Sequence, residues 1–240
     1  NLTQPSNERS KCQYRNLCPR GCPCGAYFST QSSTLPAAMK TGNLEVKTGM
    51  IVNRVIYDEQ QQKAKGVEVI DRESGKTYEY YDRVIFLNAS TVATTFLLLN
   101  STGNRFPNGL GNDHDIVGRH LMDHHKSGGV NADIEGFTDK YYYGRRPSGI
   151  YMPRFRNVKD KHPGFLRGYG VQGGASRSRN SGNGIGVELK ENITEPGGWR
   201  FGFTAFGECL PYPENRITLN KELKDKWGRP TLTIDCSFRD

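Results

Sequence analysis

Long hydrophobic runs are absent from this sequence. The longest, Phe96 to Leu99, has four residues, whereas a membrane-spanning helix needs about 20, so we expect no transmembrane segment among these residues. Hydrophobic residues make up 35% of the 240, and mean hydropathy is −0.70, which is polar for an enzyme that folds alone. The length still allows a sizeable core. The 28 glycines and 12 prolines predict many turns and few long helices.

A concentrated patch of charge is absent as well. The net charge of +8 could favour nucleic acid or an anionic surface. Lysines and arginines are scattered along the chain, however, and the densest cluster, Arg177 and Arg179, lies in a Gly/Ser-rich stretch that predicts a loop. We therefore expect a solvated basic surface and no nucleic-acid binding.

The Cys-rich head at residues 8–30 lacks two features of common zinc sites, a C-x2-C pair and a histidine. Its four cysteines follow the pattern C-x5-C-x3-C-x-C; they are Cys12, Cys18, Cys22 and Cys24. So many thiols rarely gather by chance, because a free cysteine is usually a lone buried hydrophobe. Disulfides, an iron–sulfur cluster and zinc all remain open, with zinc the least favoured.

The first half of the chain predicts a β-meander, then a buried strand and a helix. Alternating apolar residues between polar turns predict four strands, at residues 44–47, 51–57, 66–71 and 77–81. The continuously apolar run 83–88 is typical of a strand buried on both faces. Ser90 and Thr91 follow as a predicted N-cap of a helix over 93–99. Open α/β sheets bind ligands where such a strand meets a helix, although the arrangement also occurs in many ordinary cores.

The second half, from about Gly128, is rich in glycine and aromatic residues and predicts an antiparallel sheet with long loops. Its short alternating segments span residues 149–155, 186–189, 199–206, 217–219 and 232–238. The change of character places a domain boundary near residue 126. The predicted fold class is α+β with an α/β element in the first half.

Two motifs could indicate a binding site, but each also has a simpler structural interpretation. Residues 168–173 match G-x-G-x-x-G, but neither a buried strand before them nor a helix after them is predicted, so we interpret the match as a decoy. Four histidines lie near Asp113, Asp115 and Asp123, and could form a metal site; they are His114, His120, His124 and His125. A polar connection with hydrogen-bonded histidines is favoured, and no Ser-His-Asp triad follows from sequence order.

Several ordered strings resemble one family. They span residues 35–46, 49–55, 65–69, 84–90, 117–124, 214–219 and 225–230, and include Val117-Gly-Arg-His-Leu-Met-Asp-His124. Together they resemble the middle of a glucose–methanol–choline (GMC) oxidoreductase, in the branch of bacterial sugar and sugar-acid dehydrogenases. The likeness is densest over residues 35–125. It implies that residues 1–126 are part of a flavin-binding domain and residues 127–240 an incomplete substrate domain with an antiparallel sheet.

The resemblance implies an FAD-dependent enzyme that oxidises a CH–OH group of a sugar, sugar acid or related alcohol by hydride transfer to flavin. In such enzymes the backbone at the position of Val52 contacts the adenine. The family's Ala-Gly-Ala turn along the cofactor corresponds to Ala89, Ser90 and Thr91. Because Ser90 stands where the family usually has glycine, close backbone approach there is in question.

The Cys-rich head also acquires an interpretation from the resemblance. Some membrane-associated members carry an iron–sulfur cluster in a similarly placed motif, so Cys12, Cys18 and Cys22 are candidate cluster ligands. Structural thiols without metal are the alternative. The electron acceptor is expected to be oxygen, a quinone or a protein partner, and the resemblance leaves a cytoplasmic or periplasmic location open.

Two parts of the family pattern are not found among these residues. The glycine-rich pyrophosphate loop is expected upstream of residue 1, and the catalytic histidine downstream of Asp240, so no catalytic residue is assigned in this chain. We expect the 240 residues alone to be inactive. The rival hypothesis is a β-rich module, stabilised by a cysteine-bound metal, that binds an anionic polymer.

Overall fold

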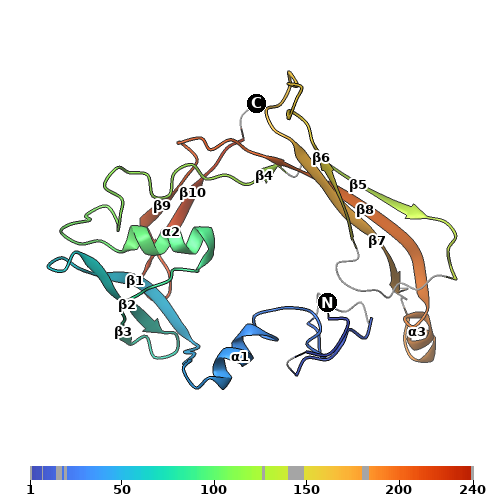
Figure 1. The fold of residues 1–240 in the computed structure, drawn as a ribbon, viewed down its shortest axis with the longest axis horizontal. Coiled ribbons are helices and arrows are strands. Elements are labelled where there is room, and N and C mark those ends of the chain that lie inside the picture. Colours follow the sequence, from blue (N-terminus) through green and yellow to red (C-terminus); the bar gives the residue numbers. More distant parts are fainter. Residues whose placement is uncertain are drawn as a thin grey trace. The chain divides into compact units, whose positions relative to one another are not determined.

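The computed structural model describes residues 2–6, 8–14, 18, 21–125, 128–139, 149–179 and 184–238, the side chains of residues 178 and 179 excepted. Antiparallel sheet predominates and a few helices accompany it (Figure 1), as the predicted α+β class requires. The chain forms two compact units, residues 46–123 with 209–240 and residues 1–45 with 124–208. The predicted domains 1–126 and 127–240 stay a prediction about the full-length protein.

The unit of residues 46–123 and 209–240 begins with a three-stranded antiparallel meander. Its strands are β1 (Met50–Asp58), β2 (Lys63–Asp71) and β3 (Thr77–Tyr81), in the order β1-β2-β3. Asp58 and Asp71 shape the two turns, since each carboxylate accepts hydrogen bonds from backbone N–H groups two and three residues on. Three of the four predicted meander strands are confirmed. The fourth, at 44–47, is wrong, because this segment is exposed and lies outside the strands of the described structure.

Helix α2 (Ser90–Asn100) lies against β1 and buries Phe96 and Leu97. Its C-terminal end is tied to the strand: the Val55 N–H donates to Ser101 Oγ at 2.8 Å, and Asn100 Nδ2 donates to the Asn53 carbonyl at 2.9 Å. The predicted helix is confirmed. Its predicted N-cap is wrong, because the cap residue is Ala89 and no side chain caps the first turn.

The strand that the sequence analysis predicted at residues 83–88, buried on both faces, is wrong. These residues form no strand, and the side chains of Val84 and Phe86 are 64% and 79% exposed. A strand requires a hydrogen-bonded neighbour, and within the described part of the chain β3 pairs only with β2, so this extended segment has none. An apolar run predicts where burial is favourable, but the partner that buries it must be supplied by another segment.

Strands β9 (Arg216–Lys224) and β10 (Pro230–Asp235) form a hairpin in the same unit. The strand predicted at 217–219 is confirmed, and the one predicted at 232–238 is confirmed as far as Asp235. Asp225 organises the turn by accepting hydrogen bonds from the N–H groups of Trp227 and Arg229. Gly118 packs directly against β9: its backbone carbonyl accepts from the Ile217 N–H at 2.7 Å, and an added Cβ would lie 2.4 Å from the Ile217 oxygen. Only glycine fits there.

Residues 124–208 form a five-stranded antiparallel sheet. Its order is β4-β8-β7-β6, with β5 also pairing with β8; the strands are β4 (His124–His125), β5 (Gly129–Ile134), β6 (Gly149–Arg154), β7 (Tyr169–Arg179) and β8 (Pro196–Glu208). The predicted strands at 149–155 and 199–206 are confirmed. The strand predicted at 186–189 is wrong, because helix α3 (Val187–Asn192) begins there after Gly186, whose φ of +82° breaks the extended run.

The G-x-G-x-x-G string lies in β7 except for Gly168, which directly precedes the strand, so it does not connect a strand to a helix. Its glycines serve cross-strand packing: a Cβ on Gly173 would lie 1.9 Å from the Gly202 carbonyl oxygen, and one on Gly170 would lie 2.4 Å from Tyr151 Oη. The interpretation as a decoy is therefore confirmed. The strand itself was missed by the sequence analysis, because its glycines suggested a loop.

The N-terminal segment contains helix α1 (Thr34–Lys40). Lys40 forms an exposed ion pair with Glu8 at 2.5 Å. No helix in the described part of the chain is long and apolar enough to cross a membrane.

Candidate functional site

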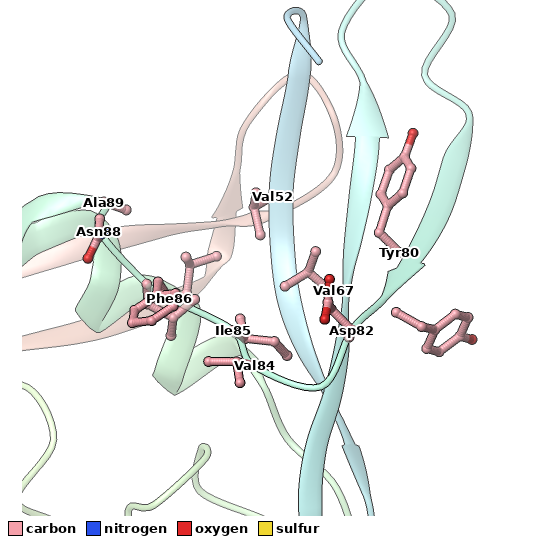
Figure 2. A pocket seen from close by; sticks show the side chains of 13 residues that line it. Val52, Val67, Tyr80, Asp82, Val84, Ile85, Phe86, Asn88 and Ala89 are labelled. Atoms are coloured by element: carbon pink, nitrogen blue, oxygen red, sulfur yellow. The ribbon is translucent and has the colours of Figure 1, made fainter. Parts of the chain in front are cut away.

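The candidate site is an open hollow of about 600 Å³ between the meander and the segment that leads into α2 (Figure 2). All of its lining belongs to the unit of residues 46–123 and 209–240. Mostly apolar side chains and two tyrosines surround it, with Asp82 and Asn88 as polar members. The lining residues are Val52, Gly66, Val67, Tyr80, Tyr81, Asp82, Val84, Ile85, Phe86, Leu87, Asn88, Ala89 and Leu97.

The extended segment after β3 forms one wall of the hollow. It leaves the meander at Asp82, passes with Val84 to Phe86 from the strands toward the helix, and reaches α2 at Asn88 and Ala89 (Figure 2). This segment has no β partner in the described structure, and its Val84 and Phe86 side chains are largely exposed, whereas Ile85 and Leu87 are half-buried. A mostly apolar hollow with a few polar groups is typical of small-molecule and cofactor sites.

Two of the four predicted cofactor residues line this hollow. Val52 comes from β1 and Ala89 from the end of the extended segment, 37 positions later in the chain. Ser90 and Thr91 begin α2 beside the hollow without lining it. Which of the four touch a cofactor stays a prediction.

Ser90 has a backbone conformation that favours glycine. Its φ is +61°, in the left-handed region, which costs a residue with a Cβ about 1 kcal/mol. This is the position at which the resemblance has glycine in place of serine. The turn therefore has the backbone conformation that glycine favours, and the serine at this position is strained.

The outer edge of β1 is held by polar side chains next to the hollow. Arg229 Nη1 lies 3.4 Å from the Val52 carbonyl oxygen, a weak hydrogen bond, and Arg229 Nε pairs with Asp225 at 2.8 Å. Partial burial would raise the pKa of the Asp225 carboxyl, but hydrogen bonds from the side chain and backbone of Arg229 outweigh it and lower the pKa. The pair keeps the Val52 backbone in a defined position.

A bulge at Asn53 turns the strand beside Val52. The β1–β2 register shifts between Val52 and Arg54. Glu68 on β2 holds both flanks of the bulge, because its carboxylate accepts from Asn53 Nδ2 at 2.7 Å and from Arg54 Nη2 at 2.8 Å. The hydrogen bonds from Arg54 lower the pKa of Glu68 below its ordinary value, against the opposing effect of partial burial.

Two buried asparagines, one in the loop of residues 103–123 and one directly before β9, have structural roles that the sequence analysis did not identify. Asn112, which is buried, accepts from the Val117 N–H at 2.9 Å and donates to the Asn108 carbonyl at 3.0 Å. Asn215, 2% exposed, donates to the Ser237 carbonyl at 3.0 Å and accepts from its N–H at 3.1 Å. Burial is the signal that distinguishes these amides from ordinary surface asparagines.

The clustered histidines have separate local contacts. His120 Nδ1 lies 2.8 Å from the Pro211 carbonyl oxygen, and the His124 ring packs edge-on against Phe206 at 5.9 Å between centroids. Asp115 pairs with Arg119 and Arg216. In the described residues no three His, Cys, Asp or Glu side chains form a group that could hold a metal.

The thiols of the Cys-rich head do not converge on one point. Cys22 and Cys24 lie 3.5 Å apart between sulfur atoms, while Cys12 is buried and accepts from the Tyr14 N–H at 3.4 Å. Burial alone would raise the pKa of Cys22, but hydrogen bonds from the Tyr27 backbone and from Cys24 lower it. The described geometry does not fit a cluster held by Cys12, Cys18 and Cys22, and it gives no support to a metal-stabilised polymer-binding module.

A meander, a helix and a mostly apolar hollow between them define an α+β protein with a candidate small-molecule site. A family model described as GMC oxidoreductase matches residues 2–126, and the chain therefore belongs to this family of oxidoreductases. The resemblance seen in the ordered strings is confirmed.

The names of two relatives give an alcohol or a sugar as the substrate. The chain is 27% identical over 224 residues to the 2-methyl-1,2-propanediol dehydrogenase of Mycolicibacterium austroafricanum, covering 90% of this chain and 40% of that protein. It is 26% identical over 243 residues to the fructose dehydrogenase large subunit of Gluconobacter japonicus, covering 97% and 43%. The 6'''-hydroxyparomomycin C oxidase of Streptomyces lividus is 29% identical over 141 residues, covering 57% and 26%. The chain thus spans about two-fifths of the length of the first two.

Proposed function

We propose that the full-length protein is an FAD-dependent oxidoreductase that acts on CH–OH groups of a sugar, sugar acid or related alcohol. The observation that carries the proposal is the hollow, which brings Val52 and Ala89 together in a chain of the GMC oxidoreductase family. Both residues correspond to cofactor-contacting positions in the resemblance. When bound, FAD would accept the hydride from the substrate carbon.

The residues of the hollow fit the ring end of such a cofactor. Val52, Val84 and Phe86 offer apolar surface to a flat ring, and Ala89 leaves room beside it (Figure 2). The Val52 carbonyl, steadied by Arg229, is within reach of a ligand's N–H group. The left-handed turn at Ser90 starts α2 beside the cofactor path. In this proposal Ser90 and Thr91 lie along the cofactor.

The chemical step depends on groups that are proposed to lie beyond these residues. The base that takes the hydroxyl proton is expected downstream of Asp240, and the pyrophosphate loop upstream of residue 1. We infer that residues 1–126 belong to the flavin domain and 127–240 to the substrate domain. Oxygen, a quinone or a protein partner is the proposed final electron acceptor.

The test is made on the purified full-length protein. Its bound cofactor is released by denaturation and identified, and the native protein is mixed without oxygen with a panel of alcohols, sugars and sugar acids. We expect bound FAD and bleaching of its visible absorbance by at least one compound. A full-length protein that neither retains FAD nor binds added FAD would overturn the proposal. The 240-residue chain alone should reduce no dye.

A further inference from the structure

The hairpin of β6 and β7 ends in a strongly basic segment. This hairpin end, residues 154–168, continues past β6 and folds back into β7 (Figure 1). Five of its residues are lysine or arginine and one is acidic, which gives a formal charge of +4, half of the +8 of the whole chain. The sequence analysis did not identify this concentration. The basic residues are Arg154, Arg156, Lys159, Lys161 and Arg167.

The basic side chains of the hairpin end are open to solvent. All five residues are exposed. Arg167 Nη1 pairs with Glu208 at 2.8 Å, and both side chains are more than half exposed, so solvent screens this pair. The other four form no ion pair with a residue that the structure describes. Their charges are therefore available to a negatively charged surface.

Large apolar side chains lie between these charges. Phe155, Val158 and Leu166 are 80%, 71% and 73% exposed. Each has a lysine or arginine as its direct neighbour in the sequence. A single exposed apolar side chain is ordinary, but several on one short segment indicate a surface that binds something.

Internal contacts hold the hairpin end in a defined conformation. Asn157, with a φ of +57°, donates from Nδ2 to the Phe165 carbonyl at 2.7 Å, and its Oδ1 accepts from the His162 N–H. The His162 ring stacks on Phe165 at 4.2 Å between centroids, and Phe165 packs edge-on against Tyr169 at 6.1 Å. The loop therefore half-buries one phenylalanine in contacts of its own, while its other large apolar side chains stay exposed.

The combination of charge and apolar surface distinguishes the hairpin end from the hollow. Val84 and Phe86 are exposed as well, but no lysine or arginine is among the residues that line the hollow. Covering the hairpin end with further protein core would remove its cations from water, which is costly unless each cation finds a partner. An anionic lipid surface accepts both kinds of group, because headgroups attract cations and the acyl boundary takes up apolar side chains.

From these observations we propose that the hairpin end docks the full-length protein on a membrane surface that contains anionic lipid. The three exposed apolar side chains enter the boundary between headgroups and acyl chains. The four cations without a described ion pair lie at the level of the lipid phosphates, with their aliphatic stems along the apolar layer. The inference goes beyond the proposed function, since it concerns attachment to a surface and not the reaction.

The test measures co-sedimentation of the full-length protein with vesicles. One set contains phosphatidylcholine alone, and the other contains equal parts of phosphatidylcholine and phosphatidylglycerol. We expect binding to the anionic vesicles, much weaker binding to the neutral ones, and release from the anionic vesicles at high salt, because salt screens the attraction.

Variants separate the apolar from the charged contribution. Phe155→Ser should weaken binding to anionic vesicles at least about tenfold, through the loss of an inserted ring. Lys159→Gln and Lys161→Gln should each weaken it about fivefold. The matched controls are Leu223→Ser, 64% exposed on β9, and Lys190→Gln, exposed on α3. Both controls should bind as the parent does, and thermal unfolding checks that every variant is folded.

The proposal fails if the full-length protein does not sediment with anionic vesicles, or if it binds neutral and anionic vesicles equally. It also fails if the three hairpin variants bind like their controls. Light scattering on the same samples identifies one rival occupant. Loss of an oligomer in Phe155→Ser, without vesicle binding by the parent, would assign the hairpin end to an interface between copies of the chain and overturn the membrane proposal.

Discussion

The hollow and the sheet of residues 124–208 differ in the space that they leave between neighbouring segments. The hollow is lined mainly by apolar side chains on an extended segment, with Val84 and Phe86 largely exposed. In the sheet, an added Cβ on Gly170 would lie 2.4 Å from Tyr151 Oη, and one on Gly173 would lie 1.9 Å from the Gly202 carbonyl oxygen. Space for a ligand is open in the first region, whereas cross-strand packing fills the space in the second. Substitutions should therefore act on ligand binding in the hollow and on folding in the sheet.

The largest effect is expected from filling the hollow. Ala89→Phe places a ring where the proposed cofactor ring lies, and we expect FAD affinity of the full-length protein to fall at least about a hundredfold, equal to about 2.7 kcal/mol. Ala37→Phe, on an exposed turn of α1, is the control. Flavin released per protein chain gives the measurement. Equal flavin content in the two variants would show that the hollow is not the cofactor site.

Two asparagines offer a direct contrast between the regions. Asn215→Ala leaves the Ser237 carbonyl and N–H without their buried partner, and we expect the unfolding free energy to fall by about 3 kcal/mol. Asn131→Ala, at an exposed position of β5, should change it by less than about 0.5 kcal/mol. Urea denaturation of the full-length protein measures both. A similar loss in the two variants would contradict the division into a buried structural amide and an exposed one.

The carboxylate behind the hollow should make stability depend on pH. The folded pKa of Glu68 is lowered, so its contribution is present above the unfolded pKa and is lost as pH falls through the folded value. Arg54 is 40% exposed, so solvent screening weakens its ion pair with Glu68. We therefore expect Glu68→Gln to lower the unfolding free energy of the protein by about 1 kcal/mol at neutral pH.

The gap between parent and Glu68→Gln should close below about pH 4. Asp133→Asn on β5 is the comparison and should show no such gap, because Arg200 and Asp133 of this ion pair are 70% and 80% exposed. Denaturation midpoints at several pH values measure both. A gap that persisted in acid would mean that the Glu68 charge is not its source.

The smallest effect concerns the turn into α2. Ser90→Gly removes a left-handed strain of about 1 kcal/mol but adds freedom to the unfolded chain, so we expect a net gain of about 0.5 kcal/mol in stability. Ser90→Ala keeps the strain and should give no gain. Thermal unfolding of the two variants, with FAD present and absent, makes the comparison. An equal gain from alanine would exclude backbone strain as the cause.

The sequence predicted the elements whose patterns are local. The alternation in 51–57, 66–71 and 77–81 marked the meander, and the apolar stretch 93–99 marked α2. It failed where an outcome depends on a distant partner. The run 83–88 has strand composition but no described neighbour to pair with, and β7 is rich in glycine yet is held as a strand between β6 and β8.

The candidate site was predictable only through the resemblance. Val52 and Ala89 have no distinctive chemistry, and nothing in spacing alone brings them together. The buried amides Asn112 and Asn215 gave no sequence signal because burial is a property of the fold. Gly173 and Gly202 are 29 positions apart, so the close approach of their backbones emerges only from the strand register. Pattern identifies elements, whereas register and partner choice produce the surfaces.

The contact of Gly118 with β9 also bears on which sequence changes this unit can tolerate. An added Cβ at Gly118 would lie 2.4 Å from the Ile217 backbone oxygen, so any other side chain would push the loop of residues 103–123 away from the hairpin. The φ of Gly118 is +90°, and an L-residue would be strained there even without that contact. The loop sequence can therefore change around this position, but the position itself accepts one amino acid.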